Sequence, residues 1–221
     1  AALYESYIQD AKDKMQHAPP FERKGIVLAM LNRLKQLCNH PILFLKEEPT
    51  SSEDIMRRSI KLQRIVNRAI DIVERGEKAL IFTQYIGMGE LIQYVLEEQF
   101  DLDVPFLTGQ MRKEERDELV QSFQRGDFPL FLLSLRAGGT GLNLTAANHV
   151  LHADRWWNPA VEEQATDRAY RIGQTQFVHV VKFMTIGTIE EKIDKMLLEK
   201  SALSDNLIQS SQWITELDDD E

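Results

Sequence analysis

Residues 129–152 read PLFLLSLRAGGTGLNLTAANHVLH, and this stretch decides the fold. The apolar run at 129–135 has the length of a strand, and a second apolar run at 148–152 follows a glycine-dense turn. Strands that are apolar without alternation are buried on both faces, as in a parallel sheet covered by helices. The stretch therefore predicts two buried strands of an α/β fold.

The same alternation of strands and helices extends outward from this stretch. Further strands are predicted at 79–82, 104–107 and 177–184. Amphipathic helices are predicted at 59–74, 88–98, 113–124, 159–170 and 188–203. Strands that alternate with helices indicate a doubly wound parallel sheet with helices on both faces.

Helical extensions are predicted at both ends of this sheet. Residues 1–40 are predicted to be helical up to Pro41, and the polar segment 46–58 is predicted to be an exposed connector. The residues therefore divide into a lead-in and connector at 1–58, a lobe at 59–200, and an extension with an acidic tail at 201–221. Because the first residue is Ala1 and the chain opens within a helical pattern, we expect a fragment of a longer protein.

Composition excludes several classes of protein. The 221 residues are 43% hydrophobic, which is enough for a core, and the net charge of -9 restricts any polyanion site to a local patch. A single cysteine, Cys38, excludes a disulfide framework and a cysteine zinc site, and the histidines have no ligand spacing. No apolar run has the length of a membrane span. We expect a soluble, intracellular chain without metal ligands or a membrane partner.

The loop at 136–143, RAGGTGLN, is a candidate phosphate site. Glycines let backbone N–H groups approach a phosphate, and Arg136, Thr140 and Asn143 could donate further hydrogen bonds. Neither the P-loop motif nor the dinucleotide fingerprint is present, since Leu144 lies where the fingerprint needs a small residue. A tight strand-to-helix turn without a ligand is an equal alternative.

Three polar residues share a face of the helix predicted at 159–170 and its continuation. Gln164, Arg168 and Arg171 are separated by four and three residues. Two guanidinium groups on a rigid face suit a γ-phosphate, because they offer fixed donors and permanent charge. The alternative is a solvated face with an Asp167–Arg171 pair, which contributes only about 0.3 kcal/mol.

Trp156 and Trp157 are candidates for nucleic-acid contact. Adjacent residues of an extended segment cannot both face one core, so at least one ring is expected to meet a groove or a partner. Packing in a core is the commoner alternative for a tryptophan. Gln84 and Thr108, which follow two predicted strands, are further candidates for phosphate contact.

In order along the chain, these segments resemble the second half of Swi/Snf-type ATPases of helicase superfamily two. The segments are LKQLCNHP (34–41), ALIFTQ (79–84), LTG (107–109), SLRAGGTGLNLT (134–145), WWNPA (156–160) and QATDRAYRIGQ (164–174). The resemblance extends from the first helix to about Lys200, and its last two segments are the most specific.

The resemblance implies the carboxyl-terminal RecA-like lobe of a two-lobed ATPase that depends on duplex DNA. ATP would bind between the lobes, with the P-loop and the magnesium ligands on the amino-terminal lobe of the same chain. The arginine fingers fall on Arg168 and Arg171. The other nucleotide contacts fall on Gly139, Gly141 and Gln164, and the DNA contacts on Gln84, Thr108, Arg136, Thr140, Asn143, Trp156 and Trp157. Arg136 replaces an expected lysine and keeps its charge, and without a P-loop the fragment alone is expected not to hydrolyse ATP.

The segment at 209–217 resembles the bacterial branch, which suggests a DNA-bound roadblock such as RNA polymerase as a partner. The expected location is the cytoplasm, in association with the nucleoid, or the nucleus if the source is eukaryotic. A non-catalytic interaction module on the same fold is the alternative, and it is disfavoured by the presence of both Arg168 and Arg171. A free-standing Rossmann-like enzyme is disfavoured by the failed fingerprint.

Overall fold

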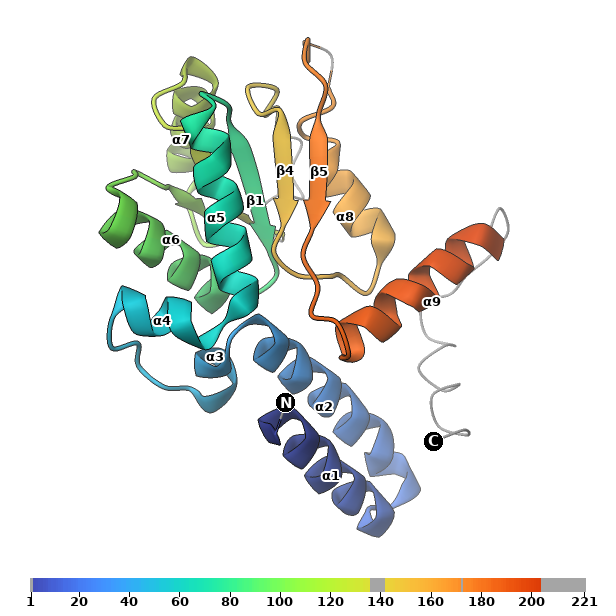
Figure 1. Ribbon diagram of the computed structural model, residues 1–221. Coiled ribbons are helices and arrows are strands. Elements are labelled where there is room, and N and C mark those ends of the chain that lie inside the picture. Colours follow the sequence, from blue (N-terminus) through green and yellow to red (C-terminus); the bar gives the residue numbers. More distant parts are fainter. Residues whose placement is uncertain (1, 136–141, 172, 204–221) are drawn as a thin grey trace.

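The computed structural model describes residues 2–135, 142–171 and 173–203, with the backbone alone at 199–203. These residues form a five-stranded parallel sheet in the order β2-β3-β1-β4-β5 (Figure 1). The strands are β1 (Ala79–Thr83), β2 (Phe106–Leu107), β3 (Leu130–Ser134), β4 (His149–His152) and β5 (His179–Lys182). Strand β1 is central, and its Ala79 pairs with Leu130 of β3 and with His149 of β4.

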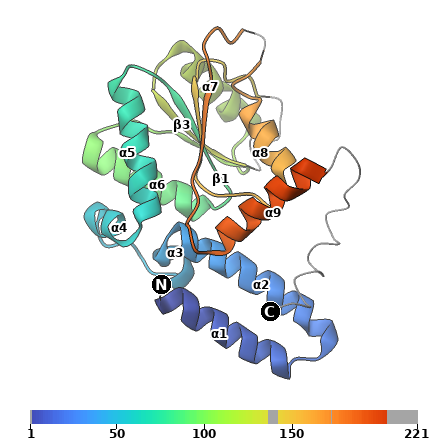
Figure 2. The ribbon, with the colours of Figure 1, turned by 45° about the vertical axis from the view of Figure 1, so that its right-hand side comes forward.

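Helices cover both faces of the sheet. Helices α5 (Ile60–Glu74) and α6 (Ile86–Phe100) lie on one face, and α7 (Lys113–Arg125) and α8 (Pro159–Thr166) lie on the other (Figure 2). Side chains of β1 alternate between the two cores: Ala79 and Ile81 face α5 and α6, whereas Leu80 and Phe82 face α7 and α8. The prediction of a doubly wound α/β sheet is confirmed.

The predicted helical extensions are also present. Helices α1 (Ala2–His17) and α2 (Pro20–Asn39) form a hairpin beside the sheet, followed by the short helix α3 (Pro41–Leu45), and α9 (Ile189–Leu203) packs against α2 (Figure 1). The backbone N–H of Ile189 donates to the Tyr4 hydroxyl (2.7 Å), and the Thr185 hydroxyl donates to the Cys38 carbonyl (3.1 Å). The first and last described helices are therefore tied to each other.

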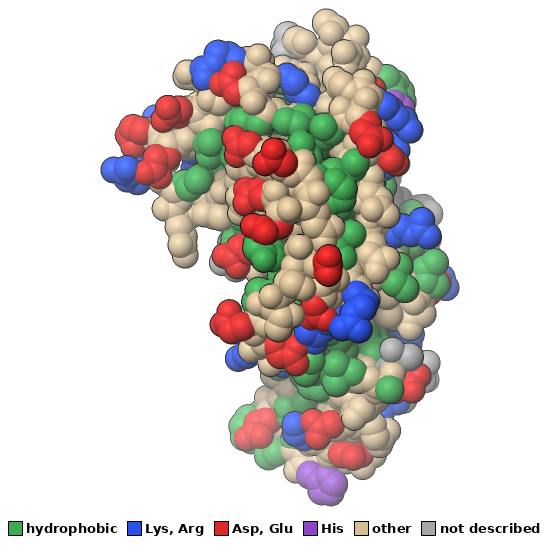
Figure 3. Space-filling model, turned by 60° about the vertical axis from the view of Figure 1, so that its left-hand side comes forward, with side chains coloured by type: hydrophobic (Ala, Val, Ile, Leu, Met, Phe, Trp, Pro, Cys, Tyr) green, Lys and Arg blue, Asp and Glu red, His purple; other side chains and the backbone are tan. Residues whose placement is uncertain are grey.

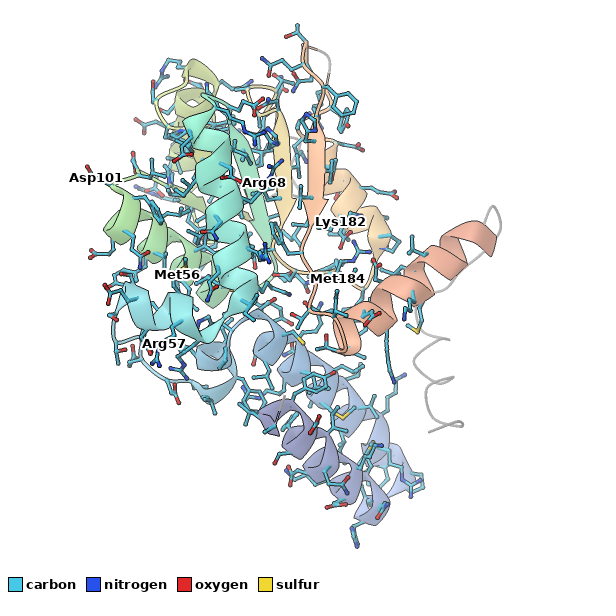
Figure 4. The ribbon with its side chains drawn as sticks, viewed as in Figure 1. Met56, Arg57, Arg68, Asp101, Lys182 and Met184 are labelled. Carbon is cyan, nitrogen blue, oxygen red and sulfur yellow. The ribbon has the colours of Figure 1, made fainter. Side chains whose placement is uncertain are left out.

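The predicted exposed connector contains a helix, α4 (Ser52–Arg58). Its N-cap, Ser51, accepts a hydrogen bond from the backbone N–H of Asp54 (3.1 Å). Ile55 is fully buried in the core formed with α5 and α6, while Arg57 points outward from the same helix (Figure 4). The connector prediction is wrong for residues 52–58 because two adjacent apolar residues, Ile55 and Met56, among polar ones give no periodic signal.

The boundaries of three other elements differ from the prediction. Helix α8 ends at Thr166, so the helix predicted through residue 170 is too long, and Arg168 and Arg171 lie beyond it. Strand β2 begins only after Pro105, which has no N–H to donate to the sheet. Strand β5 is likewise shorter than its predicted range.

The surface charge is unevenly distributed. Helix α6 carries exposed Glu90, Glu97 and Glu98 and no Lys or Arg, and acidic side chains are spread over this side of the lobe (Figure 3). This side is therefore unsuited to a polyanion. Among the described residues, each helix falls short of the length or the apolar character that crossing a bilayer requires.

Replacing Ile55 with Ala is expected to lower the free energy of unfolding by about 3 kcal/mol, because the cavity forms in a fully buried site. The matched control is Ile60→Ala, since Ile60 is 73% exposed, and its effect should stay within about 0.5 kcal/mol. Urea unfolding of both variants measures the difference. Equal effects would show that α4 is not part of the folded lobe.

His152 predicts a dependence of stability on pH. Its ring is fully buried, stacks on Phe82 with centroids 5.6 Å apart, and places Nε2 3.0 Å from the Thr166 hydroxyl. Burial lowers the pKa of His152 to about 4. A lowered folded-state pKa stabilises the fold above the unfolded value near 6.5, and this contribution is lost as pH falls toward 4.

In urea unfolding, the free energy of unfolding should therefore be lower at pH 4.5 than at pH 7. In His152→Gln this difference should be smaller by about 2–3 kcal/mol. Burial also lowers the pKa values of His40 and His149, so only the difference between wild type and variant reports on His152. The same loss in both proteins would contradict the assignment.

Candidate nucleotide and nucleic-acid site

The candidate residues come together at the carboxyl edge of the sheet. Gln84 follows β1, Thr108 follows β2, and the segment 153–157 follows β4. In an open parallel sheet, ligands bind at this edge near the point where the strand order reverses, which here is β1.

A buried carboxylate, Asp154, organises this edge. Its side chain accepts hydrogen bonds from the Thr83 hydroxyl (2.6 Å), the Gln84 backbone N–H (3.2 Å), Gln84 Nε2 (2.6 Å) and Asn39 Nδ2 (3.5 Å). Burial raises the pKa of Asp154, and the hydrogen bond from Thr83 opposes this shift. Sequence reasoning did not assign Asp154 a role, although a charged residue two positions after a buried strand was a usable signal.

Gln84 joins the loops that follow β1 and β4. Its Nε2 donates to Asp154 Oδ1 (2.6 Å) and to the Arg155 carbonyl (2.7 Å), while its Oε1 accepts from Lys35 Nζ (3.1 Å). Both amide hydrogens are thereby used within the protein, so only a lone pair of Oε1 remains for a ligand. The DNA contact of Gln84 stays a prediction restricted to that atom.

Ion pairs anchor the loop that carries the tryptophans. Arg155 is buried and pairs with Glu162 (2.6 Å) and Asp194 (2.8 Å). Glu162 also accepts from the Trp156 backbone N–H (2.9 Å) and pairs with Lys182, which reaches it from β5 (2.9 Å; Figure 4). The loop is therefore fixed to α8, β5 and α9.

Both tryptophan rings are half-buried. Trp156 packs against the core beneath α7 and α8. The ammonium of Lys35 lies 5.7 Å from the centroid of the Trp156 ring and 5.0 Å from that of Trp157. Neither ring is fully enclosed, so both keep surface for a partner.

Arg168 is a buried cation. Its side chain is 3% exposed, forms no ion pair with a described residue, and has an Nε without a hydrogen-bond partner among them. Burial lowers the pKa of Arg168, and the neighbouring positive charge of Arg171 lowers it further. The Asp167 carboxylate partly offsets this by raising the pKa of Arg168, and a further anion such as a phosphate would favour the two guanidinium groups.

Gln174 holds the turn that carries Arg168. Its Nε2 donates to the carbonyls of Thr145 (3.1 Å), Ala147 (2.8 Å) and Ala169 (3.1 Å). The Arg168 carbonyl in turn accepts from the Leu144 N–H (3.0 Å). The arginine turn is therefore fixed to the segment that precedes β4, which sequence reasoning missed because these partners lie far apart along the chain.

The remaining predicted site residues are exposed, half-buried or outside the described residues. Gln164 and Asn143 are exposed, and Thr108 is half-buried. Arg136, Gly139, Thr140 and Gly141 lie outside the described residues.

Across the described ranges, no group of acidic, histidine or cysteine side chains could hold a metal ion. An open pocket of about 680 Å³ lies instead at the amino ends of β1 and β4, beside Lys78 and Asn148.

The five-stranded parallel sheet with helices on both faces defines a RecA-like α/β lobe. A family model described as the helicase conserved C-terminal domain matches residues 61–173, and the chain belongs to this family. Within it, the chain is the carboxyl-terminal lobe of a Swi/Snf-type protein of superfamily two. The resemblance inferred from the motifs is thereby confirmed.

Relatives cover the whole chain. YwqA of Bacillus subtilis, whose name describes an ATP-dependent helicase/translocase, is 57% identical over 217 residues, which are 98% of this chain and 23% of that protein. The mouse SWI/SNF-related matrix-associated actin-dependent regulator of chromatin subfamily A member 1 is 36% identical over 195 residues, 85% of this chain and 18% of that protein. The chain thus spans less than a quarter of either relative, and the higher identity to the Bacillus protein fits the bacterial branch.

Solved structures agree with the fold. The SWI2/SNF2 ATPase core of Sulfolobus solfataricus in complex with double-stranded DNA superposes with a TM-score of 0.82 at 40% identity, over 98% of this chain and 45% of that chain. The C-terminal domain of the same ATPase gives a TM-score of 0.79 at 37% identity, over 97% of this chain and 87% of that chain. The prediction of a RecA-like lobe is confirmed.

Replacing Gln174 with Ala should leave three carbonyl groups without their side-chain donor and lower the free energy of unfolding by about 1–3 kcal/mol. The Leu144 amide, which donates to the Arg168 carbonyl, should exchange its hydrogen faster. Gln176→Ala is the matched control, because the Gln176 side chain is exposed. An unchanged exchange rate at Leu144 would show that Gln174 does not hold the arginine turn.

Proposed function

We propose that this chain is the second ATPase lobe of a Swi/Snf-type translocase that moves along duplex DNA. ATP hydrolysis would drive that movement, which remodels or displaces DNA-bound proteins. The observation that carries the proposal is the guanidinium of Arg168, which is buried beside Arg171 without an ion pair to a described residue.

Arg168 and Arg171 are the proposed catalytic residues, as arginine fingers that stabilise charge on the transferring γ-phosphate. Gly139, Gly141 and Gln164 are proposed to complete the nucleotide contacts on this lobe. The P-loop and the ligands of Mg²⁺ are assigned to the amino-terminal lobe. Closure of the two lobes on ATP would bring the arginines to the phosphate.

Duplex DNA is the proposed track. Its contacts are assigned to Gln84, Thr108, Arg136, Thr140, Asn143, Trp156 and Trp157. Support comes from the common edge of the sheet at which Gln84, Thr108 and the tryptophan segment lie, and from the related Sulfolobus core in complex with double-stranded DNA. The net charge of -9 and the acidic side over α6 would confine DNA to this edge.

The proposed partners are duplex DNA, the amino-terminal lobe of the same chain, and a DNA-bound protein such as RNA polymerase. The corresponding location is the cytoplasm, associated with the nucleoid, or the nucleus in a eukaryote. A non-catalytic interaction module remains the second candidate. It is disfavoured because a docking surface gains nothing from a buried cation such as Arg168, which forms no ion pair with a described residue and costs free energy to bury.

In the two-lobed protein, Arg171→Ala is expected to lower duplex-stimulated ATP hydrolysis by about 10³-fold or more. Arg57→Ala is the control, because Arg57 is exposed on α4, which packs on the face of the sheet opposite α8, and it pairs with Asp54. Steady-state hydrolysis with and without duplex measures both, and the 221-residue chain alone should show no turnover.

Two outcomes would overturn the proposal. Duplex-stimulated hydrolysis that survives Arg171→Ala would remove the arginine finger. No hydrolysis by the wild-type two-lobed protein would favour the interaction module.

A further inference from the structure

Lys35 of α2 is a buried lysine at the candidate DNA site. Its side chain is 0% exposed, and its Nζ donates to Gln84 Oε1 (3.1 Å). The same ammonium lies 5.0 Å from the ring centroid of Trp157, 5.7 Å from that of Trp156 and 6.0 Å from that of Tyr85. We call Lys35, Gln84, Tyr85, Trp156 and Trp157 the lysine box.

The lysine box has no carboxylate in direct contact with its cation. Lys35 forms no ion pair with a described residue, and the oxygens of nearby Asp154 are occupied by Thr83, Gln84 and Asn39. The positive charge is therefore held by one amide oxygen and by the faces of aromatic rings. A cation attracts aromatic faces more strongly when it is desolvated, so the ring positions depend on this charge.

The box joins three segments of the chain. Lys35 comes from the amino-terminal hairpin, Gln84 and Tyr85 from the loop after β1, and the tryptophans from the loop after β4. The Lys35 ammonium also sets the orientation of the Gln84 amide, since a donor to Oε1 leaves Nε2 to face Asp154 and the Arg155 carbonyl. One ammonium thus joins two of the loops to which DNA contacts are assigned.

We propose that Lys35 is a positioning residue for duplex DNA, whose ammonium holds the Trp156 and Trp157 rings and the Gln84 amide in the arrangement that meets the DNA backbone. Lys35 itself is buried and acts only through these residues. The inference rests on the proposed function, because it assigns a role at the same DNA site.

The pH range of the test follows from the charge state of Lys35. The pKa of Lys35 is lowered to about 8. Burial lowers it most and Lys61 of α5 lowers it too, whereas Asp154, Glu190 of α9 and Glu162 of α8 raise it. The other titratable groups nearby are Tyr85, whose pKa is raised, and Cys38, whose pKa is raised to about 11. The ammonium is therefore present at pH 7 and largely lost at pH 9, while these two neighbours stay protonated.

The first measurement is the tryptophan emission of the 221-residue chain in a Trp213→Phe background, which leaves Trp156 and Trp157 as the tryptophans. We expect the emission to titrate with a midpoint near pH 8. Lys35→Met should abolish this titration. Lys24→Met, at an exposed position of the same helix, should leave it unchanged.

The second measurement is the affinity of the two-lobed protein for a short duplex. Between pH 7 and pH 9 the wild-type affinity should fall by about three- to tenfold, and Lys35→Met should lose about tenfold at pH 7. Lys35→Arg keeps its charge and should bind equally at both pH values. Circular dichroism checks the fold of each variant, and if Lys35→Met does not fold, the wild type and Lys35→Arg still give the comparison.

The outcomes separate the two proposals. Binding that is independent of pH and indifferent to Lys35→Met would overturn the role of Lys35 and leave the DNA site standing. Emission that titrates while affinity does not change would make Lys35 structural only, and the lack of an emission titration would overturn the lysine box. No duplex binding by the wild type at pH 7 would overturn the proposed function itself.

Discussion

The carboxylate of Asp154 is the constraint on which the functional edge depends. A carboxylate that is 1% exposed cannot be solvated by water, so the protein must supply its hydrogen bonds. The donors come from the strand it faces, the loop after that strand, and the end of α2. Satisfying one buried group therefore fixes the relative positions of three segments that are distant in the sequence.

Buried ion pairs extend this arrangement to the helical extensions. Lys61 of α5 pairs with Glu190 of α9 at 2.6 Å, and Lys61 also donates to the Asn39 side chain (3.0 Å) at the end of α2. Such pairs contribute little net stability, because desolvation offsets their attraction, but a misplaced helix would leave a charge unpaired. The α1–α2 hairpin and α9 are therefore integral to the lobe and share its geometry.

Much of the sheet was predictable because its strands are continuous apolar runs and its long helices have a regular period. Features that depend on a short apolar pair or on distant partners were not predictable. Helix α4 packs through the adjacent residues Ile55 and Met56, and the end of α8 is followed by a turn held by the Gln174 amide. The motifs identified Arg168 and the tryptophans as candidates, but the tie from Lys35 to Gln84 spans 49 positions and leaves no local pattern.

The buried ion pairs also imply that salt affects the fold of the lobe and its proposed binding to DNA differently. Mobile ions screen charges that face solvent, and they have little access to Lys61 and Glu190, whose side chains are 4% and 0% exposed. Binding to DNA phosphates weakens steeply with added salt, because condensed counterions are released on association. In the proposed DNA complex, concentrated salt would thus release the lobe from the polynucleotide while its internal charge pairs, and with them its shape, persist.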